Sequence, residues 1–182
     1  RFIVAFSDAP AVSIVSVPNR RYPFGAQSSA ILGYTGRISS EQLAKNPQAD
    51  ALDIVGKTGL EIVYNEQLTG QDGITEVERD VNNREQRILS QRDPVPGKTV
   101  VTSIDIELQR RLSDRLQDEV NSLKAPGGAA VVLDPSTGEI LALASAPRYD
   151  NNVFVTAGNN DAIRNYIQDT AKPLLNRVIS GQ

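Results

Sequence analysis

The chain has 182 residues, of which 40% are hydrophobic and 23% are charged, and its formal net charge is -3. This length and balance are typical of a folded protein with one or two small domains. The negative charge argues against nucleic acid as the main partner, because phosphate binding depends on clustered lysine and arginine. Histidine and cysteine are both absent, which excludes thiol nucleophiles, zinc sites built from these residues and a Ser-His-Asp triad. No apolar run reaches the roughly 18 residues that a membrane span needs, so a membrane anchor would have to lie outside this chain.

The first half of the chain predicts short elements. In chain order they are a helix tail over residues 1–6, a strand over 12–17, a turning segment over 20–25, and a helix over 27–32 that ends at Gly33 or Gly36. Two capping-box patterns follow. Ser39 with Gln42 predicts a brief helix that Pro47 ends, and Thr58 with Glu61 predicts an amphipathic helix over residues 60–68.

An acidic stripe follows this helix. Residues 74–80 and 86–92 predict two strands, and Glu76, Glu78 and Asp80 fall on one face of the first strand. Three carboxylates on one face could bind calcium, but a solvated acidic face is the commoner origin of such a pattern.

The best candidate for a domain boundary is residues 93–97 (DPVPG), since two prolines and a glycine favour a linker. A strand of about five residues is expected next. Ser103 or Asp105 then caps the longest helix, which Pro126 ends. Its apolar stripe consists of Leu108, Leu112, Leu116, Val120 and Leu123.

A β-hairpin is the central prediction. Residues 129–133 and 139–144 are apolar, and Asp134 to Gly138 between them have turn chemistry. Neither run alternates cleanly, so both strands are expected to be buried on both faces, with the long helix covering one of them. Because two strands alone are marginally stable, further strands of the sheet are expected outside this chain. Two more helices are expected, over residues 161–168 and from Pro173 onward.

Candidate chemistry in the chain is sparse. Gly56-Lys57-Thr58 and Gly97-Lys98-Thr99 match the end of a phosphate-binding loop, but Ala51 and Arg92 stand where its first glycine belongs. Lys57-Thr58-Gly59 also matches one element of serine penicillin-recognising enzymes, although a helix N-cap explains it as well. Their nucleophile and base need the spacing Ser-x-x-Lys, and no serine in this chain has a lysine three residues later. Paired carboxylates could hydrolyse glycosides, but no motif singles out a pair. The sequence therefore predicts no catalytic, cofactor-binding or metal-binding residue.

A set of motif residues nevertheless spans the chain in a fixed order. They are Arg21, Tyr22 and Pro23, then Gly33, then Gly56, Lys57, Thr58, Gly59 and Glu61, then Asp105, then Asp134 and Gly138, and finally Asn176 and Arg177. With their neighbours, these residues resemble a class B penicillin-binding protein, most closely the elongation-type peptidoglycan D,D-transpeptidase.

The resemblance implies an α+β protein in two parts. Residues 1–97 would form a non-catalytic pedestal domain of the dimerisation type, made of short strands and helices. Residues 98–182 would supply the first helix and β-hairpin of the transpeptidase domain, which is incomplete because the catalytic serine would follow the chain. The parent protein would be held outside the cytoplasmic membrane by an N-terminal helix. It would cross-link peptidoglycan stem peptides through an acyl-enzyme and bind β-lactams.

Two further interpretations stay open. Pedestals of this family are similar to docking platforms for SEDS-type glycosyltransferases and for scaffold proteins of the elongation complex, so the chain could be a protein-interaction module. Alternatively, it could be a soluble α+β domain whose likeness to the family is accidental.

Overall fold

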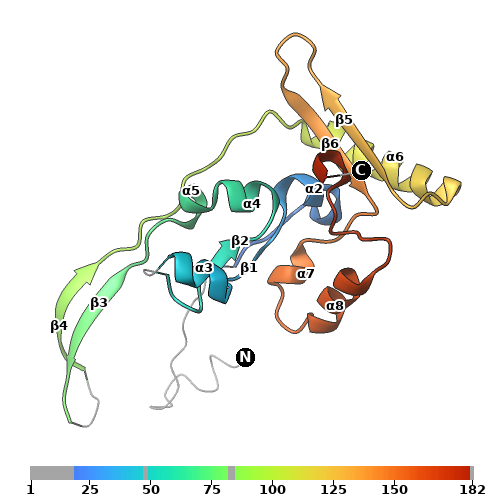
Figure 1. Ribbon diagram of the computed structural model, residues 1–182. Helices are drawn as coiled ribbons and strands as arrows, with labels where there is room; N and C mark the ends of the chain where they lie inside the picture. The colour runs from blue at the N-terminus through green and yellow to red at the C-terminus, as the bar shows by residue number, and fades with distance from the viewer. Residues whose placement is uncertain (1–18, 47–48, 82–84, 181–182) are drawn as a thin grey trace, which may run out of the picture.

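The computed structural model describes residues 19–46, 49–81 and 85–180, so the helix tail and strand expected over residues 1–6 and 12–17 lie outside it. The described strands form antiparallel pairs only: β1 (Thr35–Arg37) with β2 (Ile54–Gly56), β3 (Ile74–Arg79) with β4 (Glu85–Arg92), and β5 (Gly128–Leu133) with β6 (Ile140–Ala146). Helices pack around the first and last pairs, while β3 and β4 project away from them (Figure 1). The mixture of helix and strand confirms the expected α+β class.

The short elements of the first half follow the expected order. A 3-10 turn, η1 (Gly25–Gln27), and α2 (Ser29–Leu32) replace the single helix expected there, and α2 ends at Gly33. Helix α3 (Ser40–Lys45) begins with the predicted capping box, in which the Ser39 hydroxyl accepts from the Gln42 N–H at 3.3 Å. The Gln42 side chain accepts in return from the Ser39 N–H at 3.2 Å. Local sequence signals are therefore sufficient to place this helix.

The helix expected over residues 60–68 is wrong in two respects. It divides at Tyr64 into α4 (Gly59–Val63) and α5 (Asn65–Thr69), because the Tyr64 backbone leaves the helical region with φ -105° and ψ 21°. Thr58 occupies the N-cap position without a side-chain cap bond. The Glu61 carboxylate cannot close a capping box because the Arg20 guanidinium binds it, with Nε–Oε1 and Nη2–Oε2 distances of 2.9 Å. A salt bridge to a distant segment thus replaces the local cap.

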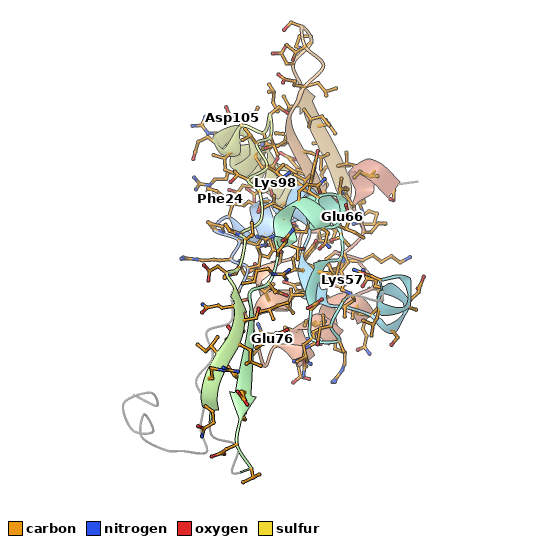
Figure 2. All side chains as sticks on the ribbon, turned by 90° about the vertical axis from the view of Figure 1, so that its left-hand side faces the viewer. Phe24, Lys57, Glu66, Glu76, Lys98 and Asp105 are labelled. Carbon is orange, nitrogen blue, oxygen red and sulfur yellow. The ribbon has the colours of Figure 1, made fainter. Side chains whose placement is uncertain are left out.

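The β3–β4 hairpin is confirmed, and it carries the acidic stripe outward. Figure 2 shows Glu76 on this projecting hairpin. Glu78 lies 3.4 Å from the Arg87 guanidinium, across the pair of strands. No group of three acidic side chains in the described part of the chain gathers closely enough to hold a metal ion.

The strand expected after Gly97 is wrong: the described chain has no strand between β4 and α6 (Ile106–Leu123). The segment is instead fixed at its start, where Gln71 and Val95 exchange two backbone hydrogen bonds of 2.8 Å. Gly97 then passes so close to Leu68 that a Cβ at position 97 would lie 2.0 Å from the Leu68 carbonyl oxygen. The predicted linker is therefore attached to the end of α5.

Helix α6 confirms the prediction of a long capped helix. The Asp105 carboxylate is its cap and accepts from the backbone N–H groups of Glu107 and Leu108 at 3.0 Å. Ser103, the alternative cap, donates to the Ile140 carbonyl instead. The apolar stripe is shorter than expected because Leu123, at the last helical position, is 73% exposed. None of the helices in the described ranges is both long and apolar enough to cross a membrane.

The central β-hairpin is confirmed, with one correction. In β6, residues 142–146 are buried, as expected for an inner strand. In β5, burial alternates, and Val131 and Leu133 are 42% and 54% exposed among the described residues. The expectation that both strands are covered on both faces is therefore wrong for β5. Helix α6 packs chiefly against β6, and its Leu116 and Val120 also approach Gly128 at the start of β5.

One glutamine closes the outer edge of β6. Gln109 of α6 is fully buried; its Nε2 donates to the Leu143 carbonyl at 2.9 Å and its Oε1 accepts from the Leu143 N–H at 2.8 Å. Nε2 also donates to the Gln27 carbonyl at 2.7 Å. The Asp105 N–H donates to the Leu141 carbonyl at 2.9 Å. An amide side chain and a helix N-terminus thus take the place of a neighbouring strand.

The chain after β6 is more helical than expected. The asparagine-rich loop contains α7 (Asn152–Val155), and α8 (Asn160–Gln168) confirms the predicted helix. The final helix, α9 (Arg177–Ser180), begins after the expected start at Pro173. The reason is a side-chain cap: Asn176 Oδ1 accepts from the Val178 N–H at 3.2 Å, which places the beginning of the helix after Asn176.

Candidate functional site

Motif residues from both ends of the sequence meet where residues 22–34 pack against residues 145–177, a contact that we call the junction. Asn152 bonds both backbone groups of Tyr22, accepting from its N–H at 3.0 Å and donating to its carbonyl at 2.9 Å. Asn151, fully buried beside it, donates to the Gly33 carbonyl at 3.0 Å. Because these bonds reach backbone atoms, they fix the position of the Tyr22 segment whatever its other side chains are.

Two more side chains complete the junction. The Tyr149 hydroxyl donates to the Ser29 carbonyl at 3.3 Å, and Asn176 Nδ2 donates to the Ala30 carbonyl at 2.8 Å. Burial of the Tyr149 ring raises the pKa of its hydroxyl to about 12, so that it remains a neutral hydrogen-bond donor. Side chains from two separate segments therefore bind helix α2 at the junction.

Aromatic rings fill the space beside these hydrogen bonds. Tyr34 stacks on Phe154 with ring centroids 3.8 Å apart, and Tyr149 meets both rings edge-on at 6.1 and 5.7 Å. Tyr166 of α8 continues the stack at 6.2 Å from Phe154. With only nine Tyr and Phe side chains in the sequence, this cluster holds nearly half of them and forms the apolar part of the junction.

Close backbone packing requires the glycines of the motif around Lys57. Gly33 and Gly59 have φ of 73° and 60° and lie against each other: a Cβ on Gly33 would be 2.1 Å from the Thr58 carbonyl oxygen. A Cβ on Gly56 would be 2.0 Å from the Glu61 carbonyl oxygen. Side chains cannot be accommodated at these positions, which explains the motif without catalysis. The Lys57 ammonium donates to Gln42 Oε1, and partial burial lowers the pKa of this lysine.

The remaining motif residues are structural caps, turns or exposed positions. Arg21 and Pro23 are exposed, whereas Tyr22 between them is buried, which raises the pKa of its hydroxyl to about 12. Asp134 accepts from the N–H and the hydroxyl of Ser136 at 2.8 and 2.6 Å. These bonds lower the pKa of the Asp134 carboxyl. Gly138, with φ of 78°, ends the same turn in open space.

Arg177 organises the segment before α9. Its guanidinium donates to the carbonyls of Ala171 and Lys172 at 2.6 and 3.1 Å. The Ser145 hydroxyl of β6 donates to the Leu175 carbonyl at 3.2 Å and accepts from the Arg177 N–H at 3.1 Å. The Ser145 hydroxyl is thus engaged with the backbone of the segment before α9.

A cavity of about 270 Å³ lies within the junction. Thr58 and Gly59 line it from the first part of the chain, and Tyr149, Asn176 and Ile179 from the second. Arg148 also lines it, but its guanidinium is held by Asp114 at 2.6 Å. Hydrogen bonds from Gln27 and Arg148 lower the pKa of the Asp114 carboxyl. Such a cavity can hold small molecules or part of a partner, but its lining carries no paired nucleophile and base.

Sequence reasoning identified the glycines, Asp105 and Asn176, but it missed several residues that build the junction. Those residues are Ser145, Tyr149, Asn151 and Asn152. A usable signal was present, since the segment from Arg148 to Asn152 (RYDNN) is unusually rich in hydrogen-bonding side chains for a segment that directly follows a buried strand.

Comparison with known families agrees with this arrangement. Residues 3–102 match the penicillin-binding protein dimerisation domain, and residues 128–180 match the penicillin-binding protein transpeptidase domain. The chain therefore belongs to the penicillin-binding protein family.

Individual relatives of the chain are peptidoglycan D,D-transpeptidases. The chain is 34% identical to the peptidoglycan D,D-transpeptidase MrdA of Haemophilus influenzae, covering 100% of this chain and 28% of that protein. It is 35% identical to the MrdA protein of Acinetobacter baumannii, covering 94% of this chain and 25% of that protein. It thus spans less than a third of these relatives.

Two solved structures of penicillin-binding proteins are also similar to the chain. The penicillin-binding protein PBP2 of Helicobacter pylori, solved in complex with MreC, superposes with a TM-score of 0.75 at 30% identity, covering 96% of this chain and 31% of that one. PBP2 of Pseudomonas aeruginosa superposes with a TM-score of 0.67 at 33% identity, covering 93% and 32%.

Proposed function

We propose that the chain is the pedestal and the opening of the transpeptidase domain of a peptidoglycan D,D-transpeptidase. In this proposal, residues 1–97 form the pedestal, and residues 98–182 begin the transpeptidase domain. The whole protein acts outside the cytoplasmic membrane, to which an N-terminal helix holds it. It cross-links stem peptides through a serine acyl-enzyme that β-lactams block, while residues 1–182 supply no catalytic group.

The junction is the observation that supports this proposal best. A pedestal that only tethers the enzyme would need few contacts with it. Here three asparagines and Tyr149 bind backbone carbonyls of the Tyr22–Gly33 segment, and the aromatic cluster is shared between the two parts. These side chains, together with the motif residues Tyr22, Gly33 and Asn176, then have a structural role: they hold the start of the transpeptidase domain in one fixed orientation on the pedestal.

Covalent labelling tests the assignment. Purified chain incubated with fluorescent penicillin should gain no covalent mass, since it has no Ser-x-x-Lys. The native parent protein should be labelled once, on a serine outside residues 1–182. A stoichiometric adduct on the chain itself would contradict the non-catalytic role, and an unlabelled, folded parent would contradict the transpeptidase assignment. Pretreatment with unlabelled penicillin is the control for specific labelling.

A second candidate function is a docking platform within the wall-synthesis complex. The Helicobacter pylori relative was solved with MreC, a partner that we propose for this chain together with a SEDS-type glycosyltransferase. Apolar side chains of β2 and α4 are available for docking, since Ile54, Ile62 and Val63 are 49%, 46% and 68% exposed. Val63→Ser should weaken capture of a purified MreC homologue, whereas Val131→Ser on β5 should not. If the Val63→Ser variant captured the MreC homologue as well as the native chain does, this face would be excluded.

A further inference from the structure

We propose that a basic groove at the C-terminal end of α6 binds an acidic peptide through its carboxylates. The groove has a volume of about 700 Å³, which lies within the usual range of small-ligand sites. It lies between the end of α6 and the segment from Thr170 to Arg177. It shares no lining residue with the junction cavity.

Three cationic side chains line the groove: Lys124 at the end of α6, and Lys172 and Arg177 from the later segment. No acidic residue of the described chain lines it, and none forms an ion pair with these three. The chain as a whole has a net charge of -3, so three uncompensated cations in one groove are a local reversal of charge. Such a concave basic site attracts anionic groups.

Two lysines of the groove, Lys124 and Lys172, have an unusual backbone conformation. Lys124 and Lys172 have φ of 50° and 49° and are the non-glycine residues with positive φ in the described ranges. Glycine or asparagine normally occupies this conformation. The helix dipole favours a cation at the end of α6 and so accounts for the charge of Lys124. The dipole does not account for the charge of Lys172, which comes from another segment. A ligand that both lysines bind would account for the charge of each.

The groove also offers neutral hydrogen-bonding groups. Asn121 and Thr170 line it beside the lysines, and both are exposed. The Arg177 guanidinium is held in place by the Ala171 and Lys172 carbonyls, so its charge is fixed while the lysine ammonium groups can adapt. Fixed and adaptable cations, with amide and hydroxyl groups between them, suit a peptide that carries more than one carboxylate.

The choice of an acidic peptide rests on the proposed function, because stem peptides of the cell wall carry free carboxylates. The probe is the tripeptide Ala-γ-Glu-Lys with free carboxylates and an N-terminal fluorophore, and the comparison is its diamide, which lacks both carboxylates but keeps the lysine ammonium. Binding to the full chain is followed by fluorescence anisotropy. The tripeptide should bind more tightly than the diamide, and its affinity should fall as salt screens the charges.

Asparagine is the replacement of choice because it tolerates positive φ. Lys124→Asn and Lys172→Asn should each weaken tripeptide binding about fivefold. Lys98→Asn, which removes an exposed lysine outside the groove, is the matched control and should leave binding unchanged. Equal affinity for the diamide, equal affinity for inorganic phosphate, or unchanged binding by both groove variants would overturn the proposal. These results would leave penicillin labelling of the parent unaffected, so a failure here is distinct from a failure of the proposed function.

Discussion

Replacing Gln109 by leucine removes three hydrogen bonds, two that hold α6 to β6 and one that holds α6 to η1. The change leaves three backbone groups without their hydrogen-bond partner, the buried Gln109 side chain. They are the Leu143 N–H, the Leu143 carbonyl and the Gln27 carbonyl. A buried polar group without a partner costs roughly 1–3 kcal/mol. Burial of the leucine side chain offsets about 1–2 kcal/mol of this loss. We therefore expect the free energy of unfolding to fall by about 4 kcal/mol, a large part of the roughly 5–15 kcal/mol typical of a domain.

Urea unfolding followed by far-UV circular dichroism measures this change. Gln67→Leu is the matched control, since Gln67 is an exposed glutamine on α5, and it should change stability by no more than about 0.5 kcal/mol. Gln109→Glu keeps the acceptor for the Leu143 N–H but loses both donors, so it should also destabilise the chain and should do so less at acidic pH. A Gln109→Leu variant within about 1 kcal/mol of the native chain would refute the view that this amide replaces a strand.

Three further changes test other parts of the fold. Glu61→Gln should cost about 1–2 kcal/mol, less than a fully buried ion pair, because Arg20 is 38% exposed; an unchanged melting temperature would contradict this. Hydrogen bonds hold the pKa of Asp114 below its unfolded value, so their contribution is complete above about pH 4 and is lost as the pH falls. Asp114→Asn should flatten the acid limb of the stability profile, and an identical limb would count against this pair. Gly33→Ala should prevent stable folding, whereas Gly138→Ala, which has the same left-handed φ but open space, should cost only about 1 kcal/mol; equal losses in thermal unfolding would refute the packing argument.

The features predicted from the sequence are those that neighbouring residues determine. The Ser39 capping box, the Asp105 cap and the turn between Asp134 and Gly138 all depend on bonds between residues at most four positions apart. The family resemblance was confirmed as well, because its motifs are local in sequence. The order of elements and the hairpin could therefore be predicted without the structure.

The errors come from long-range contacts. Arg20 lies 41 positions before Glu61 and takes the carboxylate that the local pattern assigned to a cap. Asn151 and Asn152 read as loop residues, yet their partners lie 118 and 130 positions away. Burial of β5 was overestimated because an apolar composition does not show which face is covered. The junction could not be derived from periodicity, since its bonds join side chains to backbone atoms of a segment that sequence patterns leave unspecified.

The closed edge of β6 limits how this sheet can associate. At Leu141 and Leu143, helix α6 already occupies backbone groups that an added strand would need, whereas no strand of the described chain pairs with the outer edge of β5. A strand can therefore join this sheet only along β5. If two copies of the isolated chain, without the further strands expected outside it, met edge to edge through this sheet, each would use the open β5 edge of the other. Association through this sheet would then stop at a symmetric pair and could not propagate into a fibril.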